Sequence, residues 1–91
     1  MQIEEVFSSK PRMKILKLIA HLGTLNVSEI ARRIGLNYTN TNQHLKILEE
    51  ESILQEKTYG RIRMYKYNMT STKAKAVQNL IETWERENSK T

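Results

Sequence analysis

Residues 27–51, VSEIARRIGLNYTNTNQHLKILEEE, carry the pattern that decides the fold. In residues 27–34 the apolar side chains recur at i, i+3, i+4 and i+7, which is the spacing of one buried helix face. Gly35 can end this helix, and Asn37 can cap a second helix over residues 38–51. Two helices joined by a tight turn that contains glycine predict a helix-turn-helix.

The sequence on either side adds a helix and a hairpin. Upstream, residues 10–22 have an amphipathic helical pattern, and a turn over residues 23–26 leads from them into the helix-turn-helix. Downstream, Ile53–Tyr59 and Arg61–Met69 are rich in β-branched and aromatic residues and flank Gly60. This pattern predicts a β-hairpin.

A last helix over residues 71–87 completes the expected single domain of residues 1–91. The predicted fold class is mainly α (α+β), a winged helix-turn-helix. It has a three-helix core in residues 10–51, a two-stranded wing in residues 53–69 and a C-terminal dimerisation helix.

Two apolar segments near the ends of the chain are candidates for a subunit interface. Residues 2–8 could form a short helix or an arm that packs on a partner. The last helix has an apolar stripe with a tryptophan, a residue enriched at interfaces, although the same stripe could simply complete the core. A domain this small also gains stability from pairing, so we expect a homodimer. The candidate interface residues are Ile3, Val6, Phe7, Val77, Leu80, Ile81 and Trp84.

The start of the second helix is unusually rich in amide and hydroxyl side chains. Residues 37–43 read NYTNTNQ, and both Asn and Thr are poor helix formers. The following HLKIL segment is clearly amphipathic, so these polar groups are expected to face outward from the first turns. Amide and hydroxyl groups can read base edges in the DNA major groove, whereas the alternative is a polar loop before a short helix.

The predicted hairpin is the second candidate site. A wing with arginine at its tip can reach along a DNA backbone or into a minor groove. The alternative is an ordinary solvated hairpin whose cations deter edge pairing. Tyr65 and Tyr67 are expected to pack the hairpin against the helices. The candidate wing contacts are Lys57, Tyr59, Arg61 and Arg63.

Charge favours a polyanionic partner. The formal net charge is +5, and no acidic residue occurs between Lys57 and Ile81. Because cations neutralise phosphates, this distribution points to double-stranded DNA, although a solvated face of a basic protein would look similar.

Composition excludes several classes of protein. The chain contains no cysteine, which rules out disulfides and thiolate metal sites and fits a cytoplasmic protein. No apolar run is long enough for a membrane helix, and the N-terminus does not resemble a signal peptide. His21 and His44 form no recognisable metal set, so we expect no metal and no cofactor. We expect His44 to have a packing or hydrogen-bonding role.

Residues Leu36–Leu48, LNYTNTNQHLKIL, together with Ile53–Leu54, Gly60–Arg61 and Tyr65, resemble the ArsR-type winged-helix repressors and their archaeal relatives. The MarR-type regulators share parts of this pattern. The resemblance covers about residues 10–70. It implies a homodimer that binds a partly palindromic DNA site and regulates transcription. The metal-sensing members use cysteines that this chain lacks, so the resemblance does not imply a metal inducer. By position, it assigns DNA-facing roles to Tyr38, Thr39, Asn40, Asn42, Gln43 and Lys46, and wing roles to Arg61 and Arg63.

The predicted function is therefore a sequence-specific regulator of transcription that binds double-stranded DNA and is not an enzyme. No nucleophile–base pair, phosphate loop or metal set is recognisable in the sequence. Two alternatives stay open, because fold does not dictate function. The chain could be a winged-helix module for protein–protein interaction, or it could bind RNA.

Overall fold

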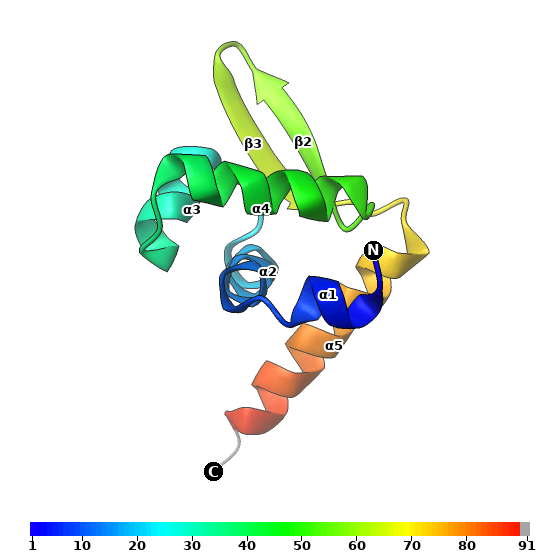
Figure 1. Ribbon diagram of the computed structural model, residues 1–91. Coiled ribbons are helices and arrows are strands. Elements are labelled where there is room, and N and C mark those ends of the chain that lie inside the picture. Colours follow the sequence, from blue (N-terminus) through cyan, green and yellow to red (C-terminus); the bar gives the residue numbers. More distant parts are fainter. Residues whose placement is uncertain (90–91) are drawn as a thin grey trace.

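The computed structural model describes residues 1–89, and it has the order of elements expected of a winged helix-turn-helix (Figure 1). Lys90 and Thr91, which the single-domain prediction includes, lie outside the described residues. The elements are α1 (Ile3–Phe7), α2 (Lys10–Leu22), β1 (Leu25–Asn26), α3 (Val27–Ile34), α4 (Tyr38–Glu50), β2 (Leu54–Tyr59), β3 (Ile62–Tyr67) and α5 (Thr72–Asn88).

Side-chain caps set the start of the helices. The residue before each of the four longer helices accepts a hydrogen bond from a backbone N–H of the first turn, which satisfies a group that the helix itself leaves unpaired. Gly35 ends α3 in the left-handed region at φ 72°, where glycine has no steric penalty. The caps are Ser9 for α2, Asn26 for α3, Asn37 for α4 and Ser71 for α5.

The expected turn before α3 contains a short strand. Leu25 and Asn26 form β1, which pairs antiparallel with β3 opposite Tyr65 and Met64. The sheet therefore has three strands in the order β1-β3-β2 rather than the two of a plain hairpin. Two residues are too few to show a strand period in the sequence, and their partner lies about 40 positions away along the chain.

The hydrophobic core surrounds α2, which contacts α1, α3, α4, α5 and β3. Tyr65 and Tyr67 are buried in this core, as expected, and the Tyr67 hydroxyl donates a 2.7 Å hydrogen bond to the backbone carbonyl of Leu16. The wing strand is thereby attached to the central helix. Among residues 1–89, no helix is both long and apolar enough to cross a membrane.

One core position on α4 holds a hydroxyl group. Thr41 is fully buried, and its Oγ1 has no hydrogen-bond partner among the described residues. We expect Thr41→Val to raise the free energy of unfolding by about 1 kcal/mol, because valine keeps the shape and the β-branch but removes an unsatisfied polar group. Chemical unfolding of both proteins measures this difference. Thr41→Ser, which keeps the hydroxyl and loses the methyl, should instead be less stable than the wild type. A less stable valine variant would show that the hydroxyl has a partner.

Candidate nucleic-acid interface

The outer side of α4 has the polar surface that the sequence predicts. Thr39, Gln43 and Lys46 repeat at i, i+4 and i+7 and are exposed, so they form one stripe along the helix. Tyr38 and Asn40 are also exposed beside the start of this stripe. The four of these side chains that precede Lys46 are available to a partner that approaches the N-terminal turns of α4. Lys46 lies further along the helix and is paired with Glu49 and Glu56.

Asn42 is placed differently from its neighbours. It is only partly exposed, and its amide oxygen is buried without a hydrogen-bond partner among the described residues. Asn42 therefore turns part of its amide towards the protein, so less of it is open to a partner than in Asn40 or Gln43.

A hollow of about 230 Å³ joins α4 to the wing and to the start of α3. Tyr38 lines it from α4, Arg61 and Arg63 line it from the wing, and Ser28 lines it from the first turn of α3. Asn26, the cap of α3, also lies at its wall. The exposed Arg61, a hydroxyl and a helix N-terminus together suit a DNA phosphate.

Sequence reasoning missed Asn26 and Ser28 as site residues. The signal was present, since a cap followed by an exposed serine at the start of the first helix of a helix-turn-helix places polar groups beside the second helix, α4. Nothing in the sequence, however, indicates that the wing tip folds towards this helix end.

The four candidate wing residues point in different directions. Arg61 is exposed at the hairpin tip beside Gly60, whose φ of 63° suits a tight turn. Lys57 and Tyr59 are exposed on the face of β2 opposite to Glu56, because side chains alternate along a strand. Arg63 is half-buried on the same face as Glu56, towards α4. Arg61 is thus the wing cation with the greatest freedom to reach a partner.

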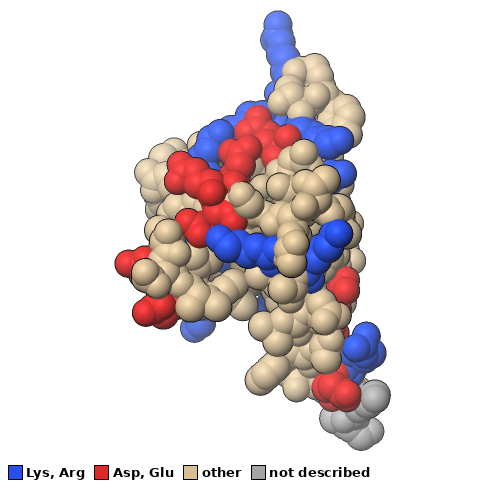
Figure 2. All heavy atoms as spheres, turned by 90° about the vertical axis from the view of Figure 1, so that its right-hand side faces the viewer, with Lys and Arg blue, Asp and Glu red and all other residues tan. Residues whose placement is uncertain are grey.

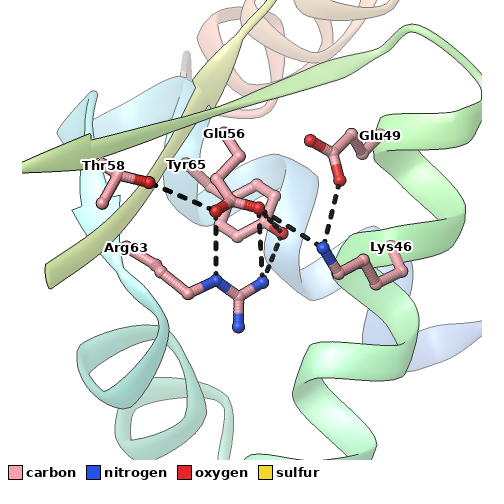
Figure 3. A network of polar contacts seen from close by, with 6 residues as sticks. All are labelled: Lys46, Glu49, Glu56, Thr58, Arg63 and Tyr65. Carbon is pink, nitrogen blue, oxygen red and sulfur yellow. Dashed lines mark hydrogen bonds and ion pairs between the residues drawn. The ribbon is translucent and has the colours of Figure 1, made fainter. Parts of the chain in front are cut away.

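Glu56 lies at the centre of a polar network between the wing and α4 (Figure 3). Arg63 donates to its two carboxylate oxygens from Nε at 3.2 Å and from Nη2 at 3.4 Å. The Tyr65 hydroxyl donates to Glu56 at 3.1 Å and accepts from Arg63 Nη2 at 2.9 Å. Lys46 Nζ reaches the same carboxylate at 3.4 Å and Glu49 at 3.6 Å. The network connects α4, β2 and β3.

The network shifts the ionisation of Glu56 and Arg63 towards their charged forms and keeps Tyr65 neutral. The hydrogen bond from Arg63 is the main reason that the pKa of Glu56 lies below its usual value. The hydrogen bonds with Glu56 likewise raise the pKa of Arg63 above its ordinary value. Burial raises the pKa of the Tyr65 hydroxyl, which therefore stays protonated and able to donate. The ion pairs are thus present throughout the neutral range.

A buried arginine supports α4 from beneath. Arg12 on α2 is only 9% exposed, and it donates from Nε to the Val6 carbonyl at 3.0 Å and from Nη2 to the Glu5 carbonyl at 2.7 Å. Its Nη1 lies 3.0 Å from Nδ1 of His44 on α4. Burial and the charge of Arg12 lower the pKa of His44, so this imidazole is neutral near pH 7 and its Nδ1 accepts the hydrogen bond.

The seven candidate interface residues divide into two groups. Val6, Val77 and Ile81 are buried in the core of the chain itself, and Phe7 packs against that core. The other three are exposed, and their exposed fractions are 69% for Ile3, 60% for Leu80 and 65% for Trp84. Leu80 and Trp84 also line a hollow of about 310 Å³ beside α2. Of the seven candidates, those left exposed for pairing are therefore one residue of α1 and two of α5.

Charge is unevenly distributed over the surface. Figure 2 shows cationic side chains at the wing tip at the top of the view, and acidic side chains gathered at the height of α4. The sequence places three acids, Glu49–Glu51, at the end of α4. At the height of α5 the same view shows both cationic and acidic side chains beside uncharged surface. Within residues 1–89, no three or more histidine or acidic side chains are grouped as metal ligands.

Comparison with known proteins agrees with this geometry. The sequence profile of bacterial regulatory proteins of the arsR family matches residues 9–56. An uncharacterised helix-turn-helix transcriptional regulator of Bacillus subtilis (strain 168), YfiV, is 40% identical over 47 residues, which are 52% of this chain and 29% of that protein. The chain thus spans less than a third of the length of this relative.

Two solved structures share the fold. Reduced HlyU from Vibrio cholerae has a TM-score of 0.76 at 23% identity, over 90% of this chain and 80% of that chain. The homodimeric winged helix-turn-helix DNA-binding domain of Mb0332 from Mycobacterium bovis has a TM-score of 0.75 at 21% identity, over 92% of this chain and 75% of that chain.

These relatives are bacterial, so the expected relationship to archaeal members of the family is not supported. The predicted resemblance to ArsR-type regulators is confirmed by the profile match. The shared fold confirms the predicted winged helix-turn-helix. Because the profile covers more than half of the sequence, the chain belongs to the arsR family of bacterial regulatory proteins.

Proposed function

We propose that the protein is a homodimeric regulator of transcription that binds a specific, partly palindromic site in double-stranded DNA. The observation that supports this most strongly is the hollow shared by Tyr38, Arg61, Arg63 and the first turn of α3. It brings the amide-rich end of α4 and the cationic wing to the same side of the molecule. A partner that combines base edges with phosphates, namely duplex DNA, suits both surfaces at once.

In this proposal the N-terminal half of α4 enters the major groove. The exposed Asn40 and Gln43 can each bond a base edge with both donor and acceptor atoms, while Thr39 can bond a base or a phosphate. Asn42 contributes less, because its amide oxygen is buried. Arg61, Lys57 and Tyr59 of the wing follow the adjacent backbone.

Dimerisation would present two copies of α4 to successive turns of the duplex. The exposed Ile3, Leu80 and Trp84 supply the apolar surface for this pairing. A two-fold axis would place the recognition helices about one helical turn apart, ~34–36 Å, so the preferred site should be an inverted repeat. The proposal includes no metal and no cofactor. We also propose a cytoplasmic location, because the partner would be the chromosome.

Selection of bound duplexes from a random pool tests partner, symmetry and specificity together. We expect an inverted repeat whose half-sites are centred about 10 base pairs apart. Single-stranded DNA and RNA should compete poorly with the selected duplex for binding to the protein. A pool that yields no enriched sequence, or a protein that prefers RNA, would contradict the proposal. No binding to any nucleic acid would favour a protein-interaction module.

The wing contact has its own test. Arg61→Ala should weaken binding to specific and unrelated duplexes by a similar factor and reduce the slope of log affinity against log salt by about 0.9 for each phosphate that the protein no longer neutralises. Titrations at several salt concentrations measure both effects. Arg86→Ala is the matched control, because Arg86 is exposed near the end of α5 that lies opposite the wing (Figure 1). If Arg61→Ala behaves like the control, the wing does not contact the backbone.

A further inference from the structure

The network around Glu56 is unusual for a surface that binds a polyanion. Two cations that could neutralise phosphates, Lys46 and Arg63, are both paired with a carboxylate of the protein itself. Glu49 adds a second acid to the group. The four charges cancel, so at this point the interface has no net attraction for DNA.

The pairing is built into the fold rather than formed by chance on a mobile surface. The Glu56 side chain is only 21% exposed, and its carboxylate accepts hydrogen bonds from Arg63, Tyr65, Lys46 and Thr58. Tyr65 is fully buried, so the hydroxyl that holds both Glu56 and Arg63 is fixed by the core. The bidentate approach of Arg63 adds a further geometric constraint.

The network also joins the two elements that would touch DNA. Lys46 belongs to the exposed stripe of α4 with Thr39 and Gln43, whereas Glu56 and Arg63 belong to the two wing strands (Figure 3). A contact between them sets the angle of the wing relative to the recognition helix. Side chains that read bases need such a fixed frame, because a small displacement breaks a bidentate hydrogen bond.

We propose that Glu56 is a specificity-determining residue: it holds Lys46 and Arg63 away from DNA phosphates and fixes the wing on the recognition helix. This inference rests on the proposed function. Free cations raise affinity for every duplex alike, since phosphates carry no sequence information. Because Glu56 pairs with both cations, it lowers the affinity for all duplexes and preserves the preference for the correct site.

The test compares Glu56→Gln with the wild type on the selected duplex and on an unrelated duplex. We expect the variant to bind the unrelated duplex more tightly, and the ratio of specific to non-specific affinity to fall about tenfold, the worth of one good base contact. The salt slope should become steeper by about one to two per subunit as the freed cations meet phosphates.

Glu50→Gln is the matched control, because Glu50 is exposed on α4 and has no ion pair within the described residues. It removes the same charge without releasing Lys46 or Arg63, so the affinity ratio should not change. Equal effects of the two substitutions on both duplexes would overturn the inference.

A second variant keeps the inference testable even if Glu56→Gln folds poorly. Lys46→Met removes an exposed side chain and should leave the wild-type salt slope unchanged, because Glu56 already holds the ammonium group. In the Glu56→Gln background the same change should lower the slope by about 0.9. A drop of that size in the wild type would show that Lys46 contacts a phosphate and would overturn the inference. If the wild type binds no duplex at all, the proposed function itself fails. A protein that binds DNA but whose affinity ratio is unaltered by Glu56→Gln would instead contradict only the inference about Glu56.

Discussion

Replacing Trp84 with glutamate is expected to raise the dissociation constant of the proposed homodimer by about 30-fold or more, the effect typical of a central interface tryptophan. The indole is 65% exposed in the single chain, near Leu80 at 60%, so most of its apolar surface is left uncovered. A carboxylate at this position would also have to be desolvated against a second copy. Sedimentation over a range of protein concentrations measures the dimer directly.

The same substitution should lower affinity for the selected inverted repeat by about 10²–10⁴, because each half-site would then be bound without the local concentration that pairing provides. Met69→Glu is the control. Met69 is also exposed and apolar, but it lies in the connection between β3 and α5, outside the proposed interface. Its dimer and its DNA affinity should match the wild type. A Trp84→Glu protein that stays dimeric would place the subunit interface elsewhere.

Removing the buried guanidinium of Arg12 should give the second large effect. Arg12→Met is expected to lower the free energy of unfolding by about 2–4 kcal/mol, because the Glu5 and Val6 carbonyls and His44 Nδ1 are all deprived of a charged donor. Denaturant unfolding at pH 7.5 measures the difference. Lys14→Met on the same helix is the control, because Lys14 is exposed and should be nearly neutral. Similar stabilities of the two variants would mean that water replaces the guanidinium without cost.

The same contact predicts how stability depends on pH. The pKa of folded His44 is lower than that of the unfolded chain, about 6.5, so the unfolded chain binds the proton more readily. The contribution of His44 is therefore complete above pH ~6.5 and is lost as the pH falls through the lower pKa of the folded state. In His44→Gln this part of the pH dependence should disappear. Glu56 and Glu51, whose pKa values are also lowered, lose their contributions only in the more acidic range below their usual values.

The helices were predictable from sequence because their signals are local. Asn37 and Gly35 fix the ends of neighbouring helices through their own backbone and side-chain preferences, and the structure places both ends where these residues predict. Thr41 is the exception within α4. It belongs to the polar segment that was expected to face outward, but it is fully buried because it shares the helical period of Leu45 and Leu48.

The polar contacts were not predictable because their partners are distant in the chain. Arg12 meets His44 across 32 positions, and the network of Glu56, Lys46 and Arg63 joins three different elements. For α5, the sequence could not predict which residues of the apolar stripe are buried, and the reason is different. Val77 and Ile81 face the core while Leu80 and Trp84 face solvent, and periodicity alone cannot show which edge of a broad stripe a neighbouring helix covers.

The acidic end of α4 has a consequence for the direction in which the helix can meet a nucleic acid. The exposed Glu50 stands where the backbone dipole already gives the helix its negative pole, whereas Glu49 and Glu51 are paired with cations. The opposite pole bears no acid in its first turn. A polyanion is therefore repelled from one tip and tolerated at the other. DNA would therefore approach α4 at its N-terminal end, and an encounter at the C-terminal end would be repelled before any base is contacted.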